Sequence, residues 1–482
     1  MRSGFAAVLL AALTGCATVD PYAADPIAGH LLRDDAVGYC ARLFADIDRR
    51  VDALGVRDAE AQRIAGFPYL RIDRFGSALA AADDDATRRQ AWLRRLAELD
   101  DAGRSAELAN AALPGDDLER CRVLLLSADA GRHRDLRARA VVPDDYSTAM
   151  RALGLYPLTQ FAFSAGIERW HEETRAVFAQ PVARLPVRGQ LVRFALAGDA
   201  PPVALPVATD ALGIPVLSRF DRTALLQRHA PVLEIDVAGP SDRPGTVVLD
   251  REDRPTVDPS APVAFTRIAY ALIDGRPHIQ LVYTFWFTER PSRGAFDVLA
   301  GRLDGLIWRV TLASDGTPLV YDTIHPCGCY HLFFPSEHVV ARPPADSIDE
   351  GLFAPQQVTA PRPGETIVLR IESGTHYLQR VGVEPRGGAA QRYALGDERH
   401  LASLPRTDGG TRSAYGSDGL MAGSERGERF YFWPTGIASA GQMRQWGHHA
   451  TAFVGRRHFD DPRLLDSYFT LRGPPAAALA TP

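Results

Sequence analysis

The chain has 482 residues, more than one ordinary hydrophobic core holds, so two or three domains are expected. Hydrophobic residues make up 46% and charged residues 23%, proportions typical of a globular protein and not of a disordered one. The net charge of −5 gives no reason to expect a nucleic acid as partner. The sequence contains no lysine, which excludes Schiff-base chemistry, a pyridoxal phosphate linkage and a P-loop lysine.

The first sixteen residues, MRSGFAAVLLAALTGC, read as a secretory leader, because Arg2 precedes an apolar run too short for a permanent membrane span. The last four of them, LTGC, resemble the lipobox of bacterial lipoproteins. The resemblance covers the leader alone and implies that Cys16 becomes a lipidated N-terminus, which is a stable membrane anchor. The alternative is an ordinary signal peptide with an incidental cysteine. Ala17 stands where an aspartate would resemble an inner-membrane retention signal, so we expect the outer membrane, facing the periplasm.

Four cysteines are left once Cys16 is lipidated, and an even number in an oxidising compartment suggests two disulfides. Cys40 and Cys121 lie in helical-looking segments of the first half, so their pairing is the simplest prediction. Two buried free thiols are the alternative for that pair. Cys327 and Cys329 lie together far downstream and would form the second disulfide.

After a tether over residues 17–30, the pattern from 31 to 180 is helical. The segment 36–54 repeats apolar residues at steps of three and four, which places them on one helix face. The segment 83–103 begins with acidic residues and ends at a glycine, a typical helix start and stop. We therefore expect an N-terminal helical domain over residues 31–180.

From 181 to 472 the sequence changes to proline-, valine- and glycine-rich strands. Three hairpins are predicted, with turns at 274–277, 314–317 and 373–374. Consecutive hairpins without helices between them favour an antiparallel β-sandwich or barrel-like domain. The segment 436–453 is predicted to return to helix, and residues 473–482 form a disordered tail. The expected fold class is therefore α+β, a helical domain followed by a mainly antiparallel β domain with C-terminal helices.

The stretch HPCGCYH places His325, Cys327, Cys329 and His331 at every second position, which is one face of an extended strand. Nitrogen and sulfur donors of this kind suit zinc or copper. Along an ideal strand the two histidines lie roughly 20 Å apart, so one ion cannot reach both without a bend. Three interpretations stay open: a disulfide between the two thiols, a metal site using some of these residues, and core packing with no special role.

Other residues could complete a site. His458 and Asp460 have the spacing of a ligand pair or of a base with its orienting carboxylate, although a solvated surface loop explains them equally. His449 is a candidate catalytic residue, and so is Asp304, which lies at a strand where turn chemistry is the alternative. The candidate metal ligands are thus His325, His331, His458 and Asp460, with zinc as the possible cofactor. The sequence contains no nucleophile elbow, dinucleotide fingerprint, EF-hand loop or haem motif.

These patterns favour a periplasm-facing lipoprotein whose β domain binds a small molecule or an envelope protein. A metal-dependent hydrolase with a His/Asp site is one alternative, and a structural envelope lipoprotein is the other.

Overall fold

The computed structural model describes residues 26–80, 85–198, 201–203, 205, 207–294, 296–343 and 347–472. Cys16, most of the predicted tether and the predicted tail over 473–482 lie outside these residues. Within the described ranges, no helix is both long and apolar enough to cross a membrane.

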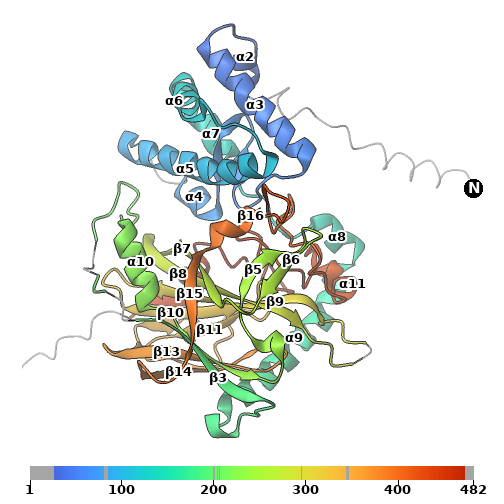
Figure 1. Ribbon diagram of the computed structural model, residues 1–482. Helices are drawn as coiled ribbons and strands as arrows, with labels where there is room; N and C mark the ends of the chain where they lie inside the picture. The colour runs from blue at the N-terminus through green and yellow to red at the C-terminus, as the bar shows by residue number, and fades with distance from the viewer. Residues whose placement is uncertain are drawn as a thin grey trace, which may run out of the picture.

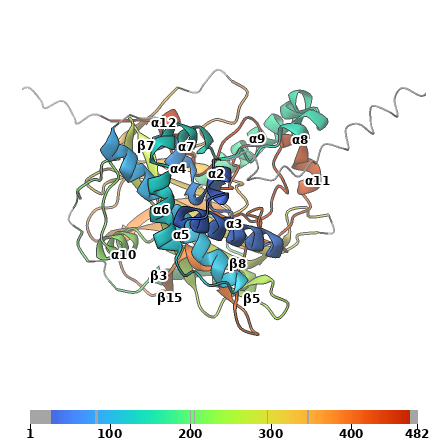
Figure 2. The same cartoon turned by 90° about the horizontal axis from the view of Figure 1, so that it is seen from above.

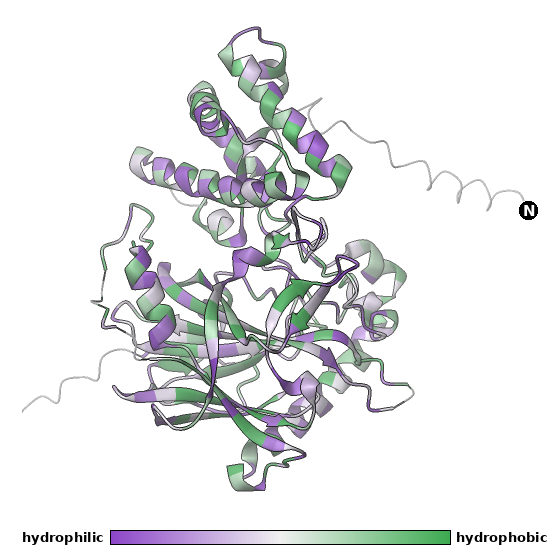
Figure 3. Ribbon diagram, viewed as in Figure 1, coloured by the Kyte–Doolittle hydropathy of each residue, from purple (hydrophilic) through white to green (hydrophobic). Residues whose placement is uncertain are grey.

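The N-terminal part is a small group of helices around a hairpin. Its elements are α2 (Ala28–Leu31), α3 (Ala36–Leu54), β1 (Gln62–Ile64), β2 (Phe67–Ile72), α4 (Arg74–Leu79), α5 (Ala86–Ala111), α6 (Leu118–Ala128), η1 (Ala130–Arg132) and α7 (His133–Arg139). Helix α3 begins where Asp35 accepts the backbone N–H of Gly38 and ends at Gly55, whose φ of 66° suits a glycine. The β1–β2 hairpin was not predicted, and all six residues of β2 are buried against α5 and α3. In Figure 1 this helical part stands apart from the sheet, and Figure 3 shows its helices carrying both polar and apolar faces.

The predicted bond between Cys40 and Cys121 is confirmed, since the two form a disulfide that joins α3 to α6. Below it, α5 carries a buried ionic network. Arg104 and Asp100 pair on the same helix at 3.0 Å, and Arg71 of β2 reaches Glu107 at 2.7 Å. Every one of these charges has a partner, as the low dielectric of an interior requires.

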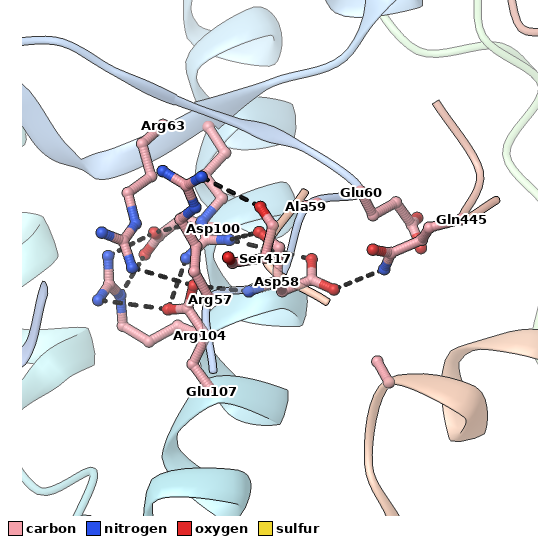
Figure 4. A network of polar contacts seen from close by, with 12 residues as sticks. Arg57, Asp58, Ala59, Glu60, Arg63, Asp100, Arg104, Glu107, Ser417 and Gln445 are labelled. Carbon is pink, nitrogen blue, oxygen red and sulfur yellow. Dashed lines mark hydrogen bonds and ion pairs between the residues drawn. The ribbon is translucent and has the colours of Figure 1, made fainter. Parts of the chain in front are cut away.

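The same network borders the β half of the chain (Figure 4). The side chain of Gln445 donates to Asp58 at 2.7 Å, and Arg57 donates to the backbone oxygen of Ser417 at 3.0 Å. A bidentate ion pair between Glu60 and Arg267 lies beside them, at 2.8 and 3.0 Å. The helical part is therefore attached to the β half by polar contacts and not by a shared apolar core alone.

The later helices of the predicted helical domain pack elsewhere. Helices α8 (Thr148–Leu153) and α9 (Tyr156–Ala179) contact η5 (Trp433–Thr435), and α9 also contacts the strand β14 (Leu378–Pro385). The change in packing thus comes between α7 and α8, before the predicted boundary at residue 180. A second short turn, η2 (Val182–Arg184), follows α9.

The β half is built on one ten-stranded sheet with the order β11-β10-β9-β8-β7-β15-β3-β4-β13-β14. Its strands are β3 (Gln190–Leu196), β4 (Val232–Val237), β7 (Val263–Ile273), β8 (Arg276–Arg290), β9 (Gly301–Leu312), β10 (Pro318–Ile324), β11 (Leu332–Pro335), β13 (Glu365–Ile371), β14 (Leu378–Pro385) and β15 (Gln391–Asp397). The three predicted hairpins are confirmed as β7–β8, β9–β10 and β13–β14. The sheet is nevertheless mixed, because β15 pairs in parallel with β3 and β7, and β13 pairs in parallel with β4.

Figure 1 shows the sheet curled, so that its two edges approach each other. Its concave side holds the largest apolar core of the described residues, with Trp308, Phe285 and Phe334 packed at its centre. Helix α10 (Arg219–Arg228) contributes Leu225 to this core, and α9 contributes Phe178. The predicted α+β class is therefore confirmed, and the curled sheet matches the barrel-like alternative and not the sandwich.

Smaller elements complete the β half. They are η3 (Pro240–Asp242), β5 (Thr246–Leu249), β6 (Pro255–Asp258), β12 (Val339–Ala341), η4 (Glu398–Ala402), β16 (Leu404–Pro405), β17 (Thr411–Arg412), α11 (Arg429–Phe432), α12 (Leu464–Tyr468) and β18 (Phe469–Leu471). The predicted helix over 436–453 is wrong, since this segment is a succession of turns and isolated bridges. Gly436, Gly441 and Gly447 within it all have φ above 80°, which a right-handed helix does not allow.

Candidate functional site

The HPCGCYH stretch is not an extended strand but the tight turn between β10 and β11. The backbone N–H of Gly328 donates to His325 at 2.8 Å, and that of His325 donates to Cys329 at 3.0 Å. Gly328 has φ of 90°, and a Cβ there would lie 2.3 Å from the carbonyl oxygen of Ala450. The turn therefore separates His325 from His331, which contact different carboxylates, and the predicted common face does not form.

His331 belongs to a buried ion cluster. Its Nε2 lies 3.0 Å from Asp322, which also receives the guanidinium of Arg309 at 2.9 Å. Burial lowers the pKa of His331 to about 3, against the raising effect of the Asp322 hydrogen bond. The rings of Phe333 and Phe459 lie against the imidazole, so His331 packs as a buried core residue.

The predicted disulfide between Cys327 and Cys329 is also corrected, since both cysteines are free and buried. A hydrogen bond between the two side chains and burial raise the pKa of Cys329 well above its ordinary value. Both thiols lie in an apolar cluster with Trp286, Met421 and Met443, where they act as packing groups.

His325 points the other way, toward a chain of alternating carboxylates and imidazoles. Its Nδ1 lies 3.2 Å from one oxygen of Asp304, a residue of β9, and the second oxygen of Asp304 lies 2.8 Å from Nδ1 of His376. His376 comes from the β13–β14 turn, and its Nε2 faces the backbone oxygen of Ser241 at 3.2 Å and Asp242 at 3.6 Å. These four side chains, Asp242, His376, Asp304 and His325, form the His325 relay, and all are buried.

The geometry assigns the protons of the relay. Both nitrogens of His376 face acceptors, so both carry a proton and the ring is an imidazolium. Burial alone would lower the pKa of His376, but hydrogen bonds with Asp242 and Asp304 raise it. Burial would raise the pKa of Asp304, yet the two histidines hold it well below its ordinary value. Burial lowers the pKa of His325, so this ring is neutral and donates its Nδ1 proton to Asp304.

That assignment leaves Nε2 of His325 as a lone-pair acceptor, and no described residue donates to it. Two tyrosines stand beside the ring: the centroids of Tyr330 and Tyr377 lie 5.1 and 5.7 Å from that of His325. Arg290 donates to the hydroxyl of Tyr377 at 3.0 Å. Tyr330 has φ of 61°, which is costly for a bulky residue and places its ring against Tyr377.

A further ionisable group, Glu428, interacts electrostatically with Asp304 of the relay. Burial raises its pKa to about 7, with Arg290 and Arg426 opposing this rise and Asp304 adding to it. Glu428 precedes α11, so the C-terminal loops reach the same site as the sheet.

His325, Tyr330 and Tyr377 line a cavity of about 190 Å³, the His325 cavity, between α9 and the sheet. Trp170 and Val177 of α9 and Leu306, Leu332 and Leu378 of the sheet give it apolar walls. Glu372, Thr174, Thr323, Gln180 and Gln379 add polar groups at its margin. A mostly apolar cavity with a few convergent polar groups is the usual form of a small-molecule site.

The remaining predicted site residues lie apart from this cavity. His458 approaches Asp145 at 3.3 Å, and Asp460 pairs with Arg74 at 3.2 Å. His449 is buried with neither ring nitrogen hydrogen-bonded, and burial lowers its pKa to about 3. Among the described residues no three His, Cys, Asp or Glu side chains converge as metal ligands, so the predicted zinc site over His325, His331, His458 and Asp460 is not found.

Of the predicted catalytic residues, only Asp304 joins the relay. Sequence reasoning missed His376, Tyr377, Arg290 and Trp170. His376 and Tyr377 directly follow the predicted turn at 373–374, and a histidine at a strand end was the only available signal. Strand order places that turn at the opposite edge of the sheet from β10 and β11, and the curl of the sheet brings the two together.

No family model, no curated protein and no solved structure matches this chain.

Proposed function

We propose that the protein is an outer-membrane lipoprotein, facing the periplasm, whose β half binds a small ligand in the His325 cavity. One observation carries the binding proposal: a buried, neutral imidazole lines the cavity with its Nδ1 fixed by Asp304 and its Nε2 without a hydrogen-bond donor. A ligand hydroxyl that donates to this nitrogen would add about 0.5–1.5 kcal/mol, the net contribution of a typical hydrogen bond.

The walls define the ligand chemistry. Nε2 of neutral His325 accepts a hydrogen bond, so the ligand offers a hydroxyl or another donor at that end. Trp170 and the leucines of the sheet face the rest of the ligand, which favours an aromatic or aliphatic body. In size the cavity suits one ring, because a cavity of about 150 Å³ holds benzene. The ligand class is therefore a small phenol or apolar alcohol.

A second candidate function is proton transfer on the same ligand. It is favoured by the Asp304–His325 pair, since a carboxylate that fixes Nδ1 increases the basicity of Nε2. His325 would accept the hydroxyl proton of the ligand. The hydroxyl group of Tyr377, which accepts a hydrogen bond from Arg290, would donate a hydrogen bond to the ligand oxygen.

Calorimetric titration with p-cresol and toluene tests the binding proposal, because the two probes differ only by the hydroxyl group. We expect p-cresol to bind about tenfold more tightly, a difference equal to one hydrogen bond. His325→Leu should abolish this preference, whereas His338→Leu, at an exposed histidine, should keep it. If neither probe binds, or if the preference survives in His325→Leu, the cavity is a packing feature and a purely structural role is favoured.

Metabolic labelling with palmitate tests the anchor separately. The wild-type chain should incorporate label and fractionate with the outer membrane, and Cys16→Ser should incorporate none. If the wild-type chain incorporates no palmitate, the leader is an ordinary signal peptide. The ligand proposal is not affected by this result.

A further inference from the structure

An exposed apolar face lies over α8, α9 and α11, away from the His325 cavity. Its large side chains are Leu155, Leu158 and Phe161 from the start of α9, with Phe430, Tyr431 and Trp433 from α11 and η5. These six side chains, called the α9–α11 face, are between 38% and 69% exposed. Figures 1 and 2 both show α8, α9 and α11 together at one side of the molecule.

The face is attached to the fold by side-chain contacts. Arg151 of α8 donates to the backbone oxygen of Thr435 at 2.7 Å, and the rings of Phe163 and Phe432 lie 5.8 Å apart. Residues 152–167 contain no charged side chain, although α9 lies on the surface along most of its length. An amphipathic surface helix would carry charged side chains on its outer side. We therefore expect this uncharged apolar surface to be covered by a binding partner.

The composition of the face fits a lipid surface better than a protein. Tryptophan and tyrosine, with an apolar body and a polar edge, concentrate at the headgroup level of membranes, and phenylalanine and leucine insert below it. Arg429 lies beside the ring of Phe430, where its guanidinium can meet a lipid phosphate.

The proposed anchor holds this face near a bilayer. Gly66 contacts Pro26, and β2, about 20 Å long, leads from there to Arg74, which bonds Asp145 three residues before α8. Residues 17–25 span at most about 35 Å between Cys16 and Pro26. This segment can therefore span more than the length of β2, which lies between Pro26 and the Arg74–Asp145 pair that precedes α8.

We propose that the α9–α11 face docks on the membrane that holds the lipid anchor, with its aromatic side chains at the headgroup level. This inference rests on the proposed anchor for its geometry, but its test does not require the anchor. The docked face would orient the whole molecule on the bilayer and place the end of α9 that borders the His325 cavity at a fixed angle to it.

The test uses the mature chain, residues 17–482, secreted from a cleavable signal peptide so that no acyl chain is attached. Binding is measured by sedimentation with vesicles of phosphatidylethanolamine and phosphatidylglycerol, three to one. Leu158→Ser with Phe161→Ser, and separately Phe430→Ser with Tyr431→Ser, remove parts of the face. Leu54→Ser with Val123→Ser is the matched control, because both residues are 58% exposed on the helical part.

We expect the wild-type and control chains to bind the vesicles, and each face variant to partition at least tenfold less. Quenching of Trp433 fluorescence by brominated lipids, lost in Trp433→Phe, gives a second readout if a face variant folds poorly. Absence of vesicle binding by the wild type, or equal binding by all variants, overturns the proposal. A wild-type dimer that the face variants dissociate assigns the face to a second copy and also overturns it. If the chain binds vesicles but is not labelled with palmitate, the proposed lipid anchor is wrong and the α9–α11 face is the proposed membrane contact by itself.

Discussion

At the scale of single residues, the site depends on Asp304, which binds two histidines in different protonation states. An isolated buried carboxylate would be protonated, so its partners decide its charge. His376 carries the compensating proton because its second nitrogen is also committed to acceptors, at Ser241 and Asp242. His325 has no second acceptor, and this asymmetry leaves a neutral base at the cavity wall.

Asp304→Asn should therefore destabilise the protein by about 3 kcal/mol, the cost of breaking a buried charge pair. The raised pKa of His376 stabilises the fold below the unfolded pKa of histidine, and this contribution is lost as pH rises through the folded pKa. The loss caused by the variant should thus be larger at pH 6 than at pH 9. Urea unfolding at both values checks this, with NMR titration of the His376 ring, whose pKa should fall. Asp46→Asn, at an exposed carboxylate of α3, is the control, and an equal loss at both pH values would contradict the imidazolium assignment.

At the scale of elements, the three hairpins were predictable because each is a local pattern of alternating residues around a turn. The β1–β2 hairpin was missed because its two short strands lie between strongly helical segments. The segment 436–453 was misassigned because its hydrophobic spacing imitates a helix, while its glycines adopt left-handed φ values. Parallel pairing of β15 with β3 and β7 joins strands far apart in the sequence, and no local signal specifies it.

The β10–β11 turn is the element that directs His325 into the cavity, and Gly328 is its critical residue. Gly328→Ala should destabilise the fold by about 2 kcal/mol or more, since the new methyl group meets the Ala450 carbonyl and φ is left-handed. Gly275→Ala in the β7–β8 turn has a similar φ and open space around it, so it should cost only about 1 kcal/mol. The difference between the two urea midpoints isolates the steric contribution. Equal midpoints would show that the β10–β11 turn relaxes freely.

The disulfide between Cys40 and Cys121 connects α3 and α6 across a separation of 81 residues. Closing a loop of that length restricts the unfolded chain and should contribute about 4 kcal/mol to the stability of the helical part. Cys40→Ala with Cys121→Ala should lower the stability of that part by this amount, while the β half unfolds at nearly its normal midpoint. Dithiothreitol should reproduce the effect in the wild type and change nothing in the double variant. A single, coincident transition for both halves would instead show that they unfold as one unit.

At the scale of the whole molecule, the site is assembled from parts that no local pattern connects. Asp304 was a predicted site residue, but its partner His376 arrives from the opposite edge of the sheet because the sheet curls. The predicted convergence of His325 with His458 is not found, because His325 lies beside Asp304 in the relay, whereas His458 lies beside Asp145. The two halves of the chain meet at a polar boundary, where Glu60 pairs with Arg267 and Gln445 binds Asp58.

This boundary should respond to pH through Asp58. Burial raises the pKa of Asp58 to about 6, with Glu60 adding to the rise and Arg71 opposing it. The folded protein therefore binds a proton that the unfolded chain releases near pH 4, so stability falls by up to about 3 kcal/mol between pH 4 and pH 6.

Asp58→Asn keeps an acceptor for Gln445 without the buried charge, so it should be more stable than the wild type at pH 7.5 and lack this pH dependence. Asp52→Asn, at a half-exposed carboxylate of α3, should leave the wild-type profile unchanged. Urea unfolding from pH 4 to 7.5 measures all three chains, and a parallel profile for Asp58→Asn and wild type would mean that Asp58 stays ionised and is compensated by Arg71.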